Sequence, residues 1–281
     1  MGAGMASRLI NQGYAVTVYN RTPSKAEPLR QLGATVALTP RQAAADANVI
    51  LSMLADDAAA HQVWLGADGA VFGAARGTLL IESSTISVDW IRELAKAAAD
   101  RGCPLLDAPV TGSKAAAAAG ELVFLVGGSP EALETGRPVL SAMSRDITHL
   151  GPSGSGALMK LINNFVCGVQ AVALAEAVAV IERSGLDRAK AVGVLTSGAP
   201  GSPLVKLISA RMTTSDYTPN FLLKLMAKDL RYALKQSGDP AAMDVVAAAL
   251  RTFERASQAG YGEMDFSSVV EIVRNSGKEN A

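Results

Sequence analysis

Short apolar runs rich in β-branched residues alternate with amphipathic stretches from Tyr14 to about Leu150, and this alternation constrains the fold most strongly. The runs are AVTVY, ATVAL, NVILSM, GTLLIES, PLLDAPV, ELVFLVGG and ITHL. Each is typical of a strand, and strands that alternate with helices form a parallel sheet covered by helices. The pattern predicts an α/β domain over residues 1–152.

The pattern changes after Gly156, where helical periodicity continues almost to the end of the sequence. Turn signals interrupt it at Gly185, at 197–201 and at 238–240. We therefore predict an all-helical domain over residues 153–281, with the domain boundary in the glycine-rich turn 151–154. Its first helix is expected to run for about 30 residues with few charges, which indicates burial in a core or in a subunit interface.

The composition fits a globular protein with two domain cores. The chain has 281 residues, of which 49% are hydrophobic, and its 26 basic and 26 acidic residues cancel. This balance gives no reason to expect nucleic acid or an anionic membrane as a partner. The apolar run 168–181 is shorter than the roughly 20 residues that cross a bilayer and contains Glu176, so we predict a buried helix.

The cysteines and histidines indicate neither disulfides nor a metal site. Cys103 and Cys167 are far apart in the sequence and form no CxxC pair, which is typical of a reducing cytoplasm. His61 and His149 fit no metal-binding pattern with them. We predict a cytoplasmic protein without a metal.

The first residues have the pattern of the second half of a dinucleotide-binding βαβ unit. Gly2, Ala3 and Gly4 precede a predicted helix, and the strand AVTVY follows it. After that strand comes Asn20-Arg21-Thr22, where enzymes that use NAD place an acidic residue on the ribose. An arginine at this place favours the 2′-phosphate of NADP. Taken alone, the glycines are also compatible with a small-residue terminus.

At these residues the sequence resembles the β-hydroxyacid dehydrogenases, the group of 3-hydroxyisobutyrate dehydrogenase and glyoxylate/succinic semialdehyde reductase. In that family a strand and the pattern G-x-G-x-M-G-x-x-M-A precede the helix; Met1-Gly2 and Met5-Ala6 match its second part. The resemblance implies an N-terminally truncated member, with a Rossmann-type domain that lacks its first strand and a long interdomain helix to an all-α domain. It also implies NADP(H) in preference to NAD(H), with Gly2, Asn20, Arg21 and Thr22 as cofactor contacts.

The segment Asp107-Ala-Pro-Val-Thr-Gly-Ser-Lys114 is the most specific motif. A strand that ends in Thr111, Gly112 and Ser113 presents backbone N–H groups and hydroxyls suited to a substrate carboxylate. A plain glycine turn is the alternative. Gly-Ser-Lys resembles the glyoxylate/succinic semialdehyde reductase branch, and the alanines at 115–119 are interpreted as a solvated connection.

Lys160 and Asn164 resemble the family motif G-x-G-x-x-x-K-x-x-x-N. They are four residues apart, so on a helix they share a face and can meet one small ligand. Reduction of a carbonyl needs a proton on oxygen, and we expect Lys160 to donate it, with a pKa lowered by burial and by its helix. Asn164 is expected to hold substrate. The alternative is a lysine that extends to solvent from an ordinary helix.

Four further residues belong to the predicted site. The resemblance places Thr85 near nicotinamide and substrate, Met53 and Leu54 along the cofactor, and Lys228 on the cofactor side of a closing segment. Ser84-Thr85 alone is also typical of a helix N-cap, a position for which Ser87 competes.

Phe221 and Asp229 are expected to close over the substrate. On a helix, Phe221, Lys228 and Asp229 would lie on nearly one face. The alternative is a core aromatic residue with a surface ion pair.

Together these patterns predict an NADP(H)-dependent oxidoreductase that reduces a small aldehyde acid of the glyoxylate or succinic semialdehyde type. A 3-hydroxyisobutyrate-type dehydrogenase acting oxidatively, an imine reductase and a catalytically inactive relative that acts by assembly are the alternatives. Lys160 argues against the imine reductase, because those relatives generally lack it. The long apolar helix predicts a homodimer or homotetramer.

Overall fold

The computed structural model describes residues 1–275, and the chain divides into two compact units. The first ends at Lys160 and the second begins at Leu161. This division falls inside helix α9 (Ser155–Ser184), whereas we predicted the boundary in the turn that precedes this helix.

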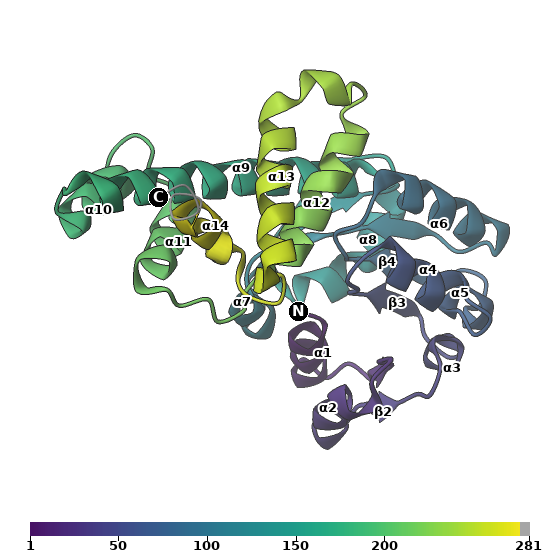
Figure 1. The fold of residues 1–281 in the computed structure, drawn as a ribbon. Coiled ribbons are helices and arrows are strands. Elements are labelled where there is room, and N and C mark those ends of the chain that lie inside the picture. Colours follow the sequence, from purple (N-terminus) through teal and green to yellow (C-terminus); the bar gives the residue numbers. More distant parts are fainter. Residues whose placement is uncertain (276–281) are drawn as a thin grey trace. The chain divides into compact units, whose positions relative to one another are not determined.

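A six-stranded sheet forms the centre of the first unit, with the order β3-β4-β5-β7-β6 and β8 beside β7. A separate two-stranded sheet pairs β1 with β2 (Figure 1). The strands are β1 (Thr17–Val18), β2 (Thr35–Val36), β3 (Val49–Ser52), β4 (Leu79–Glu82), β5 (Leu105–Asp107), β6 (Val110–Thr111), β7 (Leu122–Gly127) and β8 (Ser144–Gly151).

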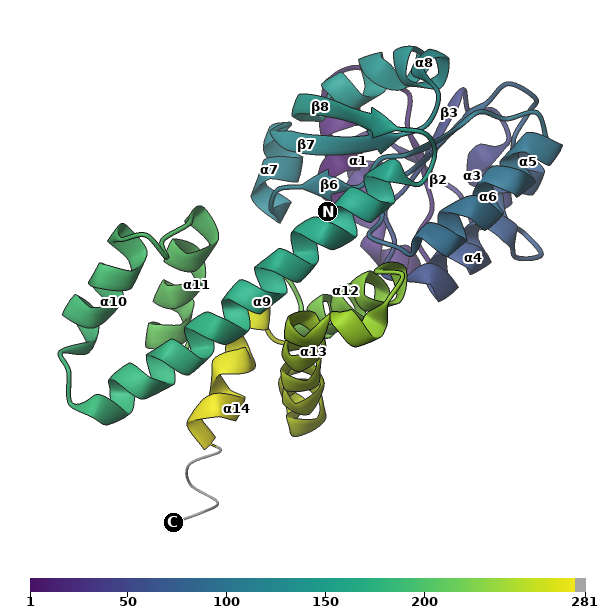
Figure 2. The ribbon, with the colours of Figure 1, turned by 90° about the horizontal axis from the view of Figure 1, so that it is seen from above.

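Helices cover both faces of the six-stranded sheet. Alternate residues of β4 face opposite cores: Leu80 packs in a cluster with α6, and Ile81 packs in a cluster with α8. Figure 2 shows these two helices on opposite faces. The helices of this unit are α1 (Gly2–Asn11), η1 (Pro23–Lys25), α2 (Glu27–Gln31), α3 (Pro40–Ala44), α4 (Asp57–Leu65), α5 (Ala70–Gly73), α6 (Val88–Asp100), α7 (Lys114–Ala119) and α8 (Pro130–Ser141).

The predicted fold class is confirmed, with one correction to the sheet. The first described element is α1, and among residues 1–275 β1 pairs only with β2. The run PLLDAPV forms two strands, β5 and β6, and β7 is antiparallel to both. The sheet is therefore mixed rather than parallel. Residues 112–121 connect β6 to β7, and this connection is shorter than the dozen or more residues that a parallel crossover needs.

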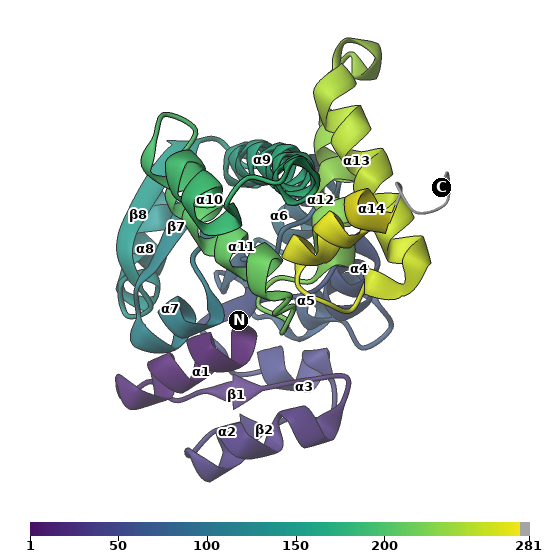
Figure 3. The ribbon, with the colours of Figure 1, turned by 60° about the vertical axis from the view of Figure 1, so that its left-hand side comes forward.

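The second unit is all-helical and has one core, to which α9, α11, α12, α13 and α14 contribute. In Figure 3, α10 and α11 lie on one side of α9, and α12 to α14 lie on the other. Beyond α9, its helices are α10 (Arg188–Ser197), α11 (Pro203–Thr214), α12 (Leu223–Gln236), η2 (Pro240–Ala242), α13 (Asp244–Ala256), η3 (Ser257–Tyr261), η4 (Phe266–Val269) and α14 (Val270–Asn275).

Helix α9 has 30 residues and is long and apolar enough to cross a membrane by these two criteria. Half of its most apolar window is buried within the structure, as in the core helix of a globular domain.

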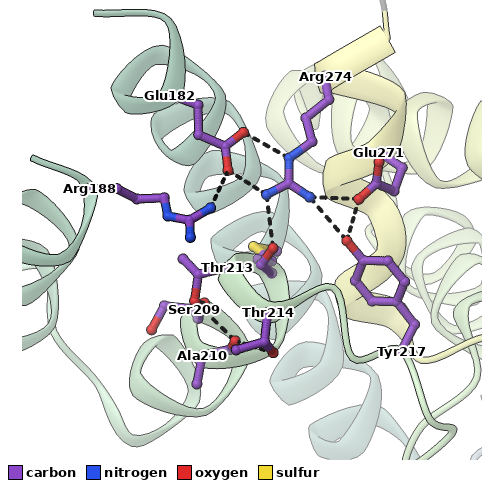
Figure 4. A network of polar contacts seen from close by, with 10 residues as sticks. Glu182, Arg188, Ser209, Ala210, Thr213, Thr214, Tyr217, Glu271 and Arg274 are labelled. Carbon is purple, nitrogen blue, oxygen red and sulfur yellow. Dashed lines mark hydrogen bonds and ion pairs between the residues drawn. The ribbon is translucent and has the colours of Figure 1, made fainter. Parts of the chain in front are cut away.

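A polar network ties the C-terminal end of α9 to α11 and α14 (Figure 4). Arg274 donates to Glu182 at 2.8 Å, to Glu271 at 2.6 Å and to the carbonyl oxygen of Met212 at 2.8 Å. The Tyr217 hydroxyl donates to Glu271, and burial together with this carboxylate raises the pKa of Tyr217 to about 12. These contacts hold the last described helix on the core.

Candidate active site

The predicted residues of the first unit follow the carboxyl ends of strands. Asn20–Thr22 follow β1, Met53 and Leu54 follow β3, and Thr85 lies beyond β4. Thr111 ends β6, which runs in the direction of β5 because both are antiparallel to β7. Ligands of α/β sheets bind outside this edge.

A buried carboxylate organises two of these loops. The Trp64 indole donates to Glu82 at 2.7 Å, and the Ser84 backbone N–H donates to the same carboxylate at 2.8 Å. The Leu54 N–H in turn donates to the Ser84 hydroxyl at 2.6 Å. Burial raises the pKa of Glu82. We did not predict this role; the available signal was a carboxylate at the end of the apolar run GTLLIES.

Serine 87, and not Ser84, caps the helix that follows β4. The Ser87 hydroxyl accepts from the Trp90 N–H at 3.1 Å at the start of α6. Ser84 is engaged with Leu54 instead, so the pair Ser84-Thr85 belongs to the strand-end loops rather than to the cap.

The N-terminal end of α1 and the end of β1 offer positive groups. Gly2 begins α1, and a Cβ at this glycine would lie 3.4 Å from the Met53 Cβ, so the helix start lies against the loop after β3. The first turn of α1 has no acidic residue to neutralise the positive end of the helix dipole. Arg21 is exposed beside Asn20, whose side chain accepts from the Thr22 N–H at 2.9 Å. These groups fit the phosphates of a dinucleotide.

The Thr111–Ser113 turn leads into a helix that we did not predict. Gly112 has a φ of 128°, and the Ser113 hydroxyl accepts from the Ala116 N–H at 3.2 Å as the N-cap of α7. The interpretation of residues 115–119 as a solvated connection holds for the exposed Ala115, Ala118 and Ala119, but it missed the helix. It is wrong for Ala117, which is buried where α7 packs on α1. Alanine has the highest helix propensity, which explains the difference.

Asp107 fixes the start of α9. Its two carboxylate oxygens accept from the Gly154 N–H at 2.7 Å and the Ala157 N–H at 2.8 Å. A Cβ at Gly156 would lie 2.2 Å from the Leu125 carbonyl oxygen, so only glycine permits this close approach to β7. Burial raises the pKa of Asp107 against the lowering effect of these N–H groups. Lys160 is half-buried in the second turn of the anchored helix.

Asn164 lies one turn after Lys160 and belongs to a buried polar cluster of the second unit. Its amide donates to Asp229 at 2.6 Å and accepts from the Asn163 amide at 2.9 Å, which fixes its orientation. Lys228 lies 3.1 Å from the other oxygen of Asp229 and 5.2 Å from the ring centre of Tyr232. The side chains of Lys228 and Asp229 are 12% and 1% exposed, so this is not the surface pair of the alternative interpretation.

Phe221 does not share a helix with Lys228 and Asp229. Helix α12 begins at Leu223, and the Phe221 N–H donates to Asp265 at 3.1 Å, while its ring packs on Phe266 with centres 5.8 Å apart. Asp265 is 1% exposed and also accepts from Asn220 at 3.1 Å. The expected common face is therefore wrong, because Asp265 holds Phe221 outside the helix.

Comparison with known proteins decides the family. Residues 1–151 match the NAD binding domain of 6-phosphogluconate dehydrogenase, and residues 154–273 match the family described as NAD-binding of NADP-dependent 3-hydroxyisobutyrate dehydrogenase. The chain belongs to the β-hydroxyacid dehydrogenase family. It is an oxidoreductase that acts on CH–OH groups with a nicotinamide dinucleotide, as the resemblance implied.

Individual relatives of this β-hydroxyacid dehydrogenase carry different names. An NAD-dependent L-serine dehydrogenase of Pseudomonas aeruginosa is 36% identical, covering 97% of this chain and 94% of the relative. The chloroplastic glyoxylate/succinic semialdehyde reductase 2 of Arabidopsis thaliana is also 36% identical, covering 98% and 77%. The structure of Mycobacterium tuberculosis 3-hydroxyisobutyrate dehydrogenase with L-serine is similar with a TM-score of 0.86 and 32% identity, covering 98% and 96%. These names agree on the chemistry and differ in substrate, and only the first of them states a cofactor.

Proposed function

We propose that this β-hydroxyacid dehydrogenase uses NADP(H) to reduce a small aldehyde acid, of the glyoxylate or succinic semialdehyde type, to the hydroxy acid. The observation that carries the proposal is the pair Lys160 and Asn164, one turn apart on α9. Asp107 anchors the helix in front of this pair, and Asp229 orients the Asn164 amide. Such an arrangement offers a proton donor and a fixed amide to one small ligand.

In this proposal the reduced nicotinamide, when bound, supplies the hydride for the carbonyl carbon. The Lys160 ammonium donates a proton to the carbonyl oxygen as the carbon accepts the hydride. Asn164 orients the substrate, because its hydrogen bonds with Asp229 and Asn163 hold the Asn164 amide in one orientation. Thr111, Gly112 and Ser113 are the proposed carboxylate contacts, and Thr85, Phe221 and Asp229 are the further proposed substrate contacts. In the reverse direction Lys160 accepts the proton.

Gly2, Asn20, Arg21, Thr22, Met53, Leu54 and Lys228 are the proposed cofactor contacts. Arg21 supports NADP, because its guanidinium follows β1 and is exposed. The family matched by residues 154–273 is described as NADP-dependent, whereas the Pseudomonas relative is named NAD-dependent. The preference of this chain for NADP or NAD therefore needs a direct binding measurement.

Arg21→Asp should weaken NADPH binding by about 10- to 100-fold, because it removes a charge-assisted contact to phosphate. NADH binding to the same variant serves as the internal control and should change by less than about threefold. Fluorescence titration of both cofactors measures this difference. Equal losses for NADPH and NADH would remove Arg21 as the selecting residue.

The second candidate function is oxidation of a 3-hydroxy acid, favoured by the relatives named for 3-hydroxyisobutyrate and L-serine. A substrate panel separates the two. We expect kcat/KM to be highest for glyoxylate or succinic semialdehyde with NADPH. Faster turnover of 3-hydroxyisobutyrate or L-serine would support the second candidate. Tight NADPH binding without turnover of any of the four would support the inactive relative that acts by assembly.

A further inference from the structure

A buried carboxylate of the second unit fixes the backbone of Phe221. The Oδ2 atom of Asp265 accepts from the backbone N–H groups of Asn220 and Phe221, each at 3.1 Å. Asp265 is 1% exposed, and a buried carboxylate is costly unless hydrogen-bond donors surround it. The carboxylate and the segment before α12 therefore depend on each other.

The contacts of Asp265 exceed those of a helix cap. Its Oδ1 atom accepts from the Ser267 N–H at 3.2 Å and from the Ser267 hydroxyl at 2.7 Å, which caps the short helix η4. One oxygen atom is enough for such a cap. The second oxygen is directed to a segment that precedes Asp265 by 44 residues at Phe221. Capping of η4 therefore explains only half of this carboxylate.

Phe266 holds the same residue at two further points. The Phe266 N–H donates to the Phe221 carbonyl oxygen at 2.8 Å, so both backbone polar groups of Phe221 are engaged. The two rings pack edge to face, with an angle of 65° between their planes, which is a favoured arrangement of aromatic pairs. The position of the Phe221 ring is therefore fixed as well as that of its backbone.

Arg211 ties the beginning of the segment to the same carboxylate. Its Nη1 atom lies 3.6 Å from Oδ2 of Asp265 and donates to the Thr218 carbonyl oxygen at 2.8 Å. Thr218 stands three residues before Phe221. The segment that connects α11 to α12 is thus held at both of its ends.

The Phe221 ring is fixed without being enclosed by the helical core. It is only partly buried at the border of that core, whereas Phe253 and Phe266 are 0% and 5% exposed. A ring that is already immobilised can contact a ligand with little further loss of conformational entropy. Phe221 therefore has the properties of a preorganised ligand contact.

We propose that Asp265 is a positioning residue for substrate binding. Together with Phe266 it holds Phe221, so that the ring meets the substrate in a fixed place. This inference rests on the proposed role of Phe221 as a substrate contact. Loss of Asp265 should therefore weaken substrate binding and leave NADPH binding unchanged.

Asp265→Ser is the test variant, because serine retains an oxygen that caps η4. This single oxygen lies closer to the backbone and cannot also reach Asn220 and Phe221. We expect KM to rise by about 10-fold for the best substrate of the panel described above, with kcat within about twofold of wild type. Ser267→Ala is the matched control: it removes one donor from the same carboxylate, leaves the contact to Phe221 and should keep the wild-type KM. Circular dichroism checks the fold of both variants, and titration measures the NADPH affinity.

A double-mutant cycle shows whether Asp265 acts through the Phe221 ring. Phe221→Ala should raise KM by itself, and Asp265→Ser should then cause no further rise. A further 10-fold rise in the double variant would overturn the positioning role, because a merely structural residue acts without the ring.

The same cycle separates this inference from the proposed function. A rise in KM for Phe221→Ala without a rise for Asp265→Ser would overturn the inference alone. An unchanged KM for Phe221→Ala, or no turnover of any substrate in the panel, would overturn the proposed substrate contact and this inference together.

Phe266→Leu keeps the inference testable if Asp265→Ser does not fold. It removes the ring contact to Phe221 and leaves an apolar side chain in the core. We expect KM to rise by about threefold, since an aromatic pair contributes less than the backbone contacts. A folded Phe266→Leu with the KM of the wild type would overturn the inference.

Discussion

The two ends of α9 are fixed by different means. At the first end, one buried carboxylate, Asp107, accepts from the neutral N–H groups of Gly154 and Ala157. At the second end, Glu182 pairs with Arg274, and their side chains are 22% and 17% exposed. Asp107 is fully desolvated, and burial raises the pKa of its carboxyl group. Glu182 is only partly desolvated, and the Arg274 guanidinium lowers the pKa of its carboxyl group. The first end holds Lys160 in position, and the second holds the helical core together.

Removal of Asp107 should give the largest effect. Asp107→Ala leaves two helical N–H groups without their acceptor, and we expect a loss of about 3 kcal/mol in unfolding free energy, together with a fall in kcat. Asp107→Asn retains one acceptor oxygen, but its amide nitrogen is a donor and would face the second N–H group, so the loss should be at least half as large. Trp64 and Trp90 both lie in the first unit, so tryptophan fluorescence during urea unfolding reports on this end. An unchanged urea midpoint for Asp107→Ala would contradict the claim that Asp107 fixes the start of α9.

Removal of Arg274 should cost less and should affect the other unit. Arg274→Met breaks the contacts to Glu182, Glu271 and the Met212 carbonyl, which solvent partly replaces; we expect a loss of about 2 kcal/mol. Circular dichroism should show the shift, while the tryptophan transition and kcat stay unchanged. Arg251→Met, at an exposed position of α13, is the matched control. An equal shift of the tryptophan transition would erase the distinction between the two ends.

The smallest effect should be a difference in pH dependence. Burial raises the pKa of Asp107, so the part of its contribution to stability that depends on pH is fully present below its ordinary value of 3.8 and is lost as pH rises through the folded value. The contacts to the Gly154 and Ala157 N–H groups remain above that pH. Arg274 lowers the pKa of Glu182, so that contribution is present above 4.5 and is lost as pH falls through the folded value. Unfolding free energies of Asp107→Asn and Glu182→Gln, each compared with wild type across acidic pH, should therefore change in opposite directions. If the two differences in unfolding free energy changed with pH in the same direction, the predicted difference between Asp107 and Glu182 would be refuted.

Much of the fold was predictable, because it depends on local patterns. The apolar runs located the strands, and the loss of that pattern after Gly156 located the helical unit. The reversal of β7 was not predictable from these runs, since a strand buried in a mixed sheet has the same composition as one in a parallel sheet. Helix α7 was missed because five alanines have high helix propensity but no amphipathic pattern.

The site was predictable as a set of motifs but not as a network. Lys160 and Asn164 could be paired from their spacing on one helix. Glu82 and Asp265 could not be assigned, because their roles depend on partners far away in the sequence, such as Trp64 and Phe221. For the same reason, the position of Phe221 outside α12 followed from a tertiary contact rather than from helical spacing.

The most direct test of the central claim is the turnover of Lys160→Ala with glyoxylate and NADPH. Lys96→Ala, an exposed lysine of α6, is the matched control, and NADPH titration confirms that both variants bind the cofactor. We predict that kcat falls by about 100-fold or more for Lys160→Ala and stays at the wild-type level for Lys96→Ala. A Lys160→Ala enzyme that retains kcat within about threefold of wild type would contradict the assignment of Lys160 as the proton donor.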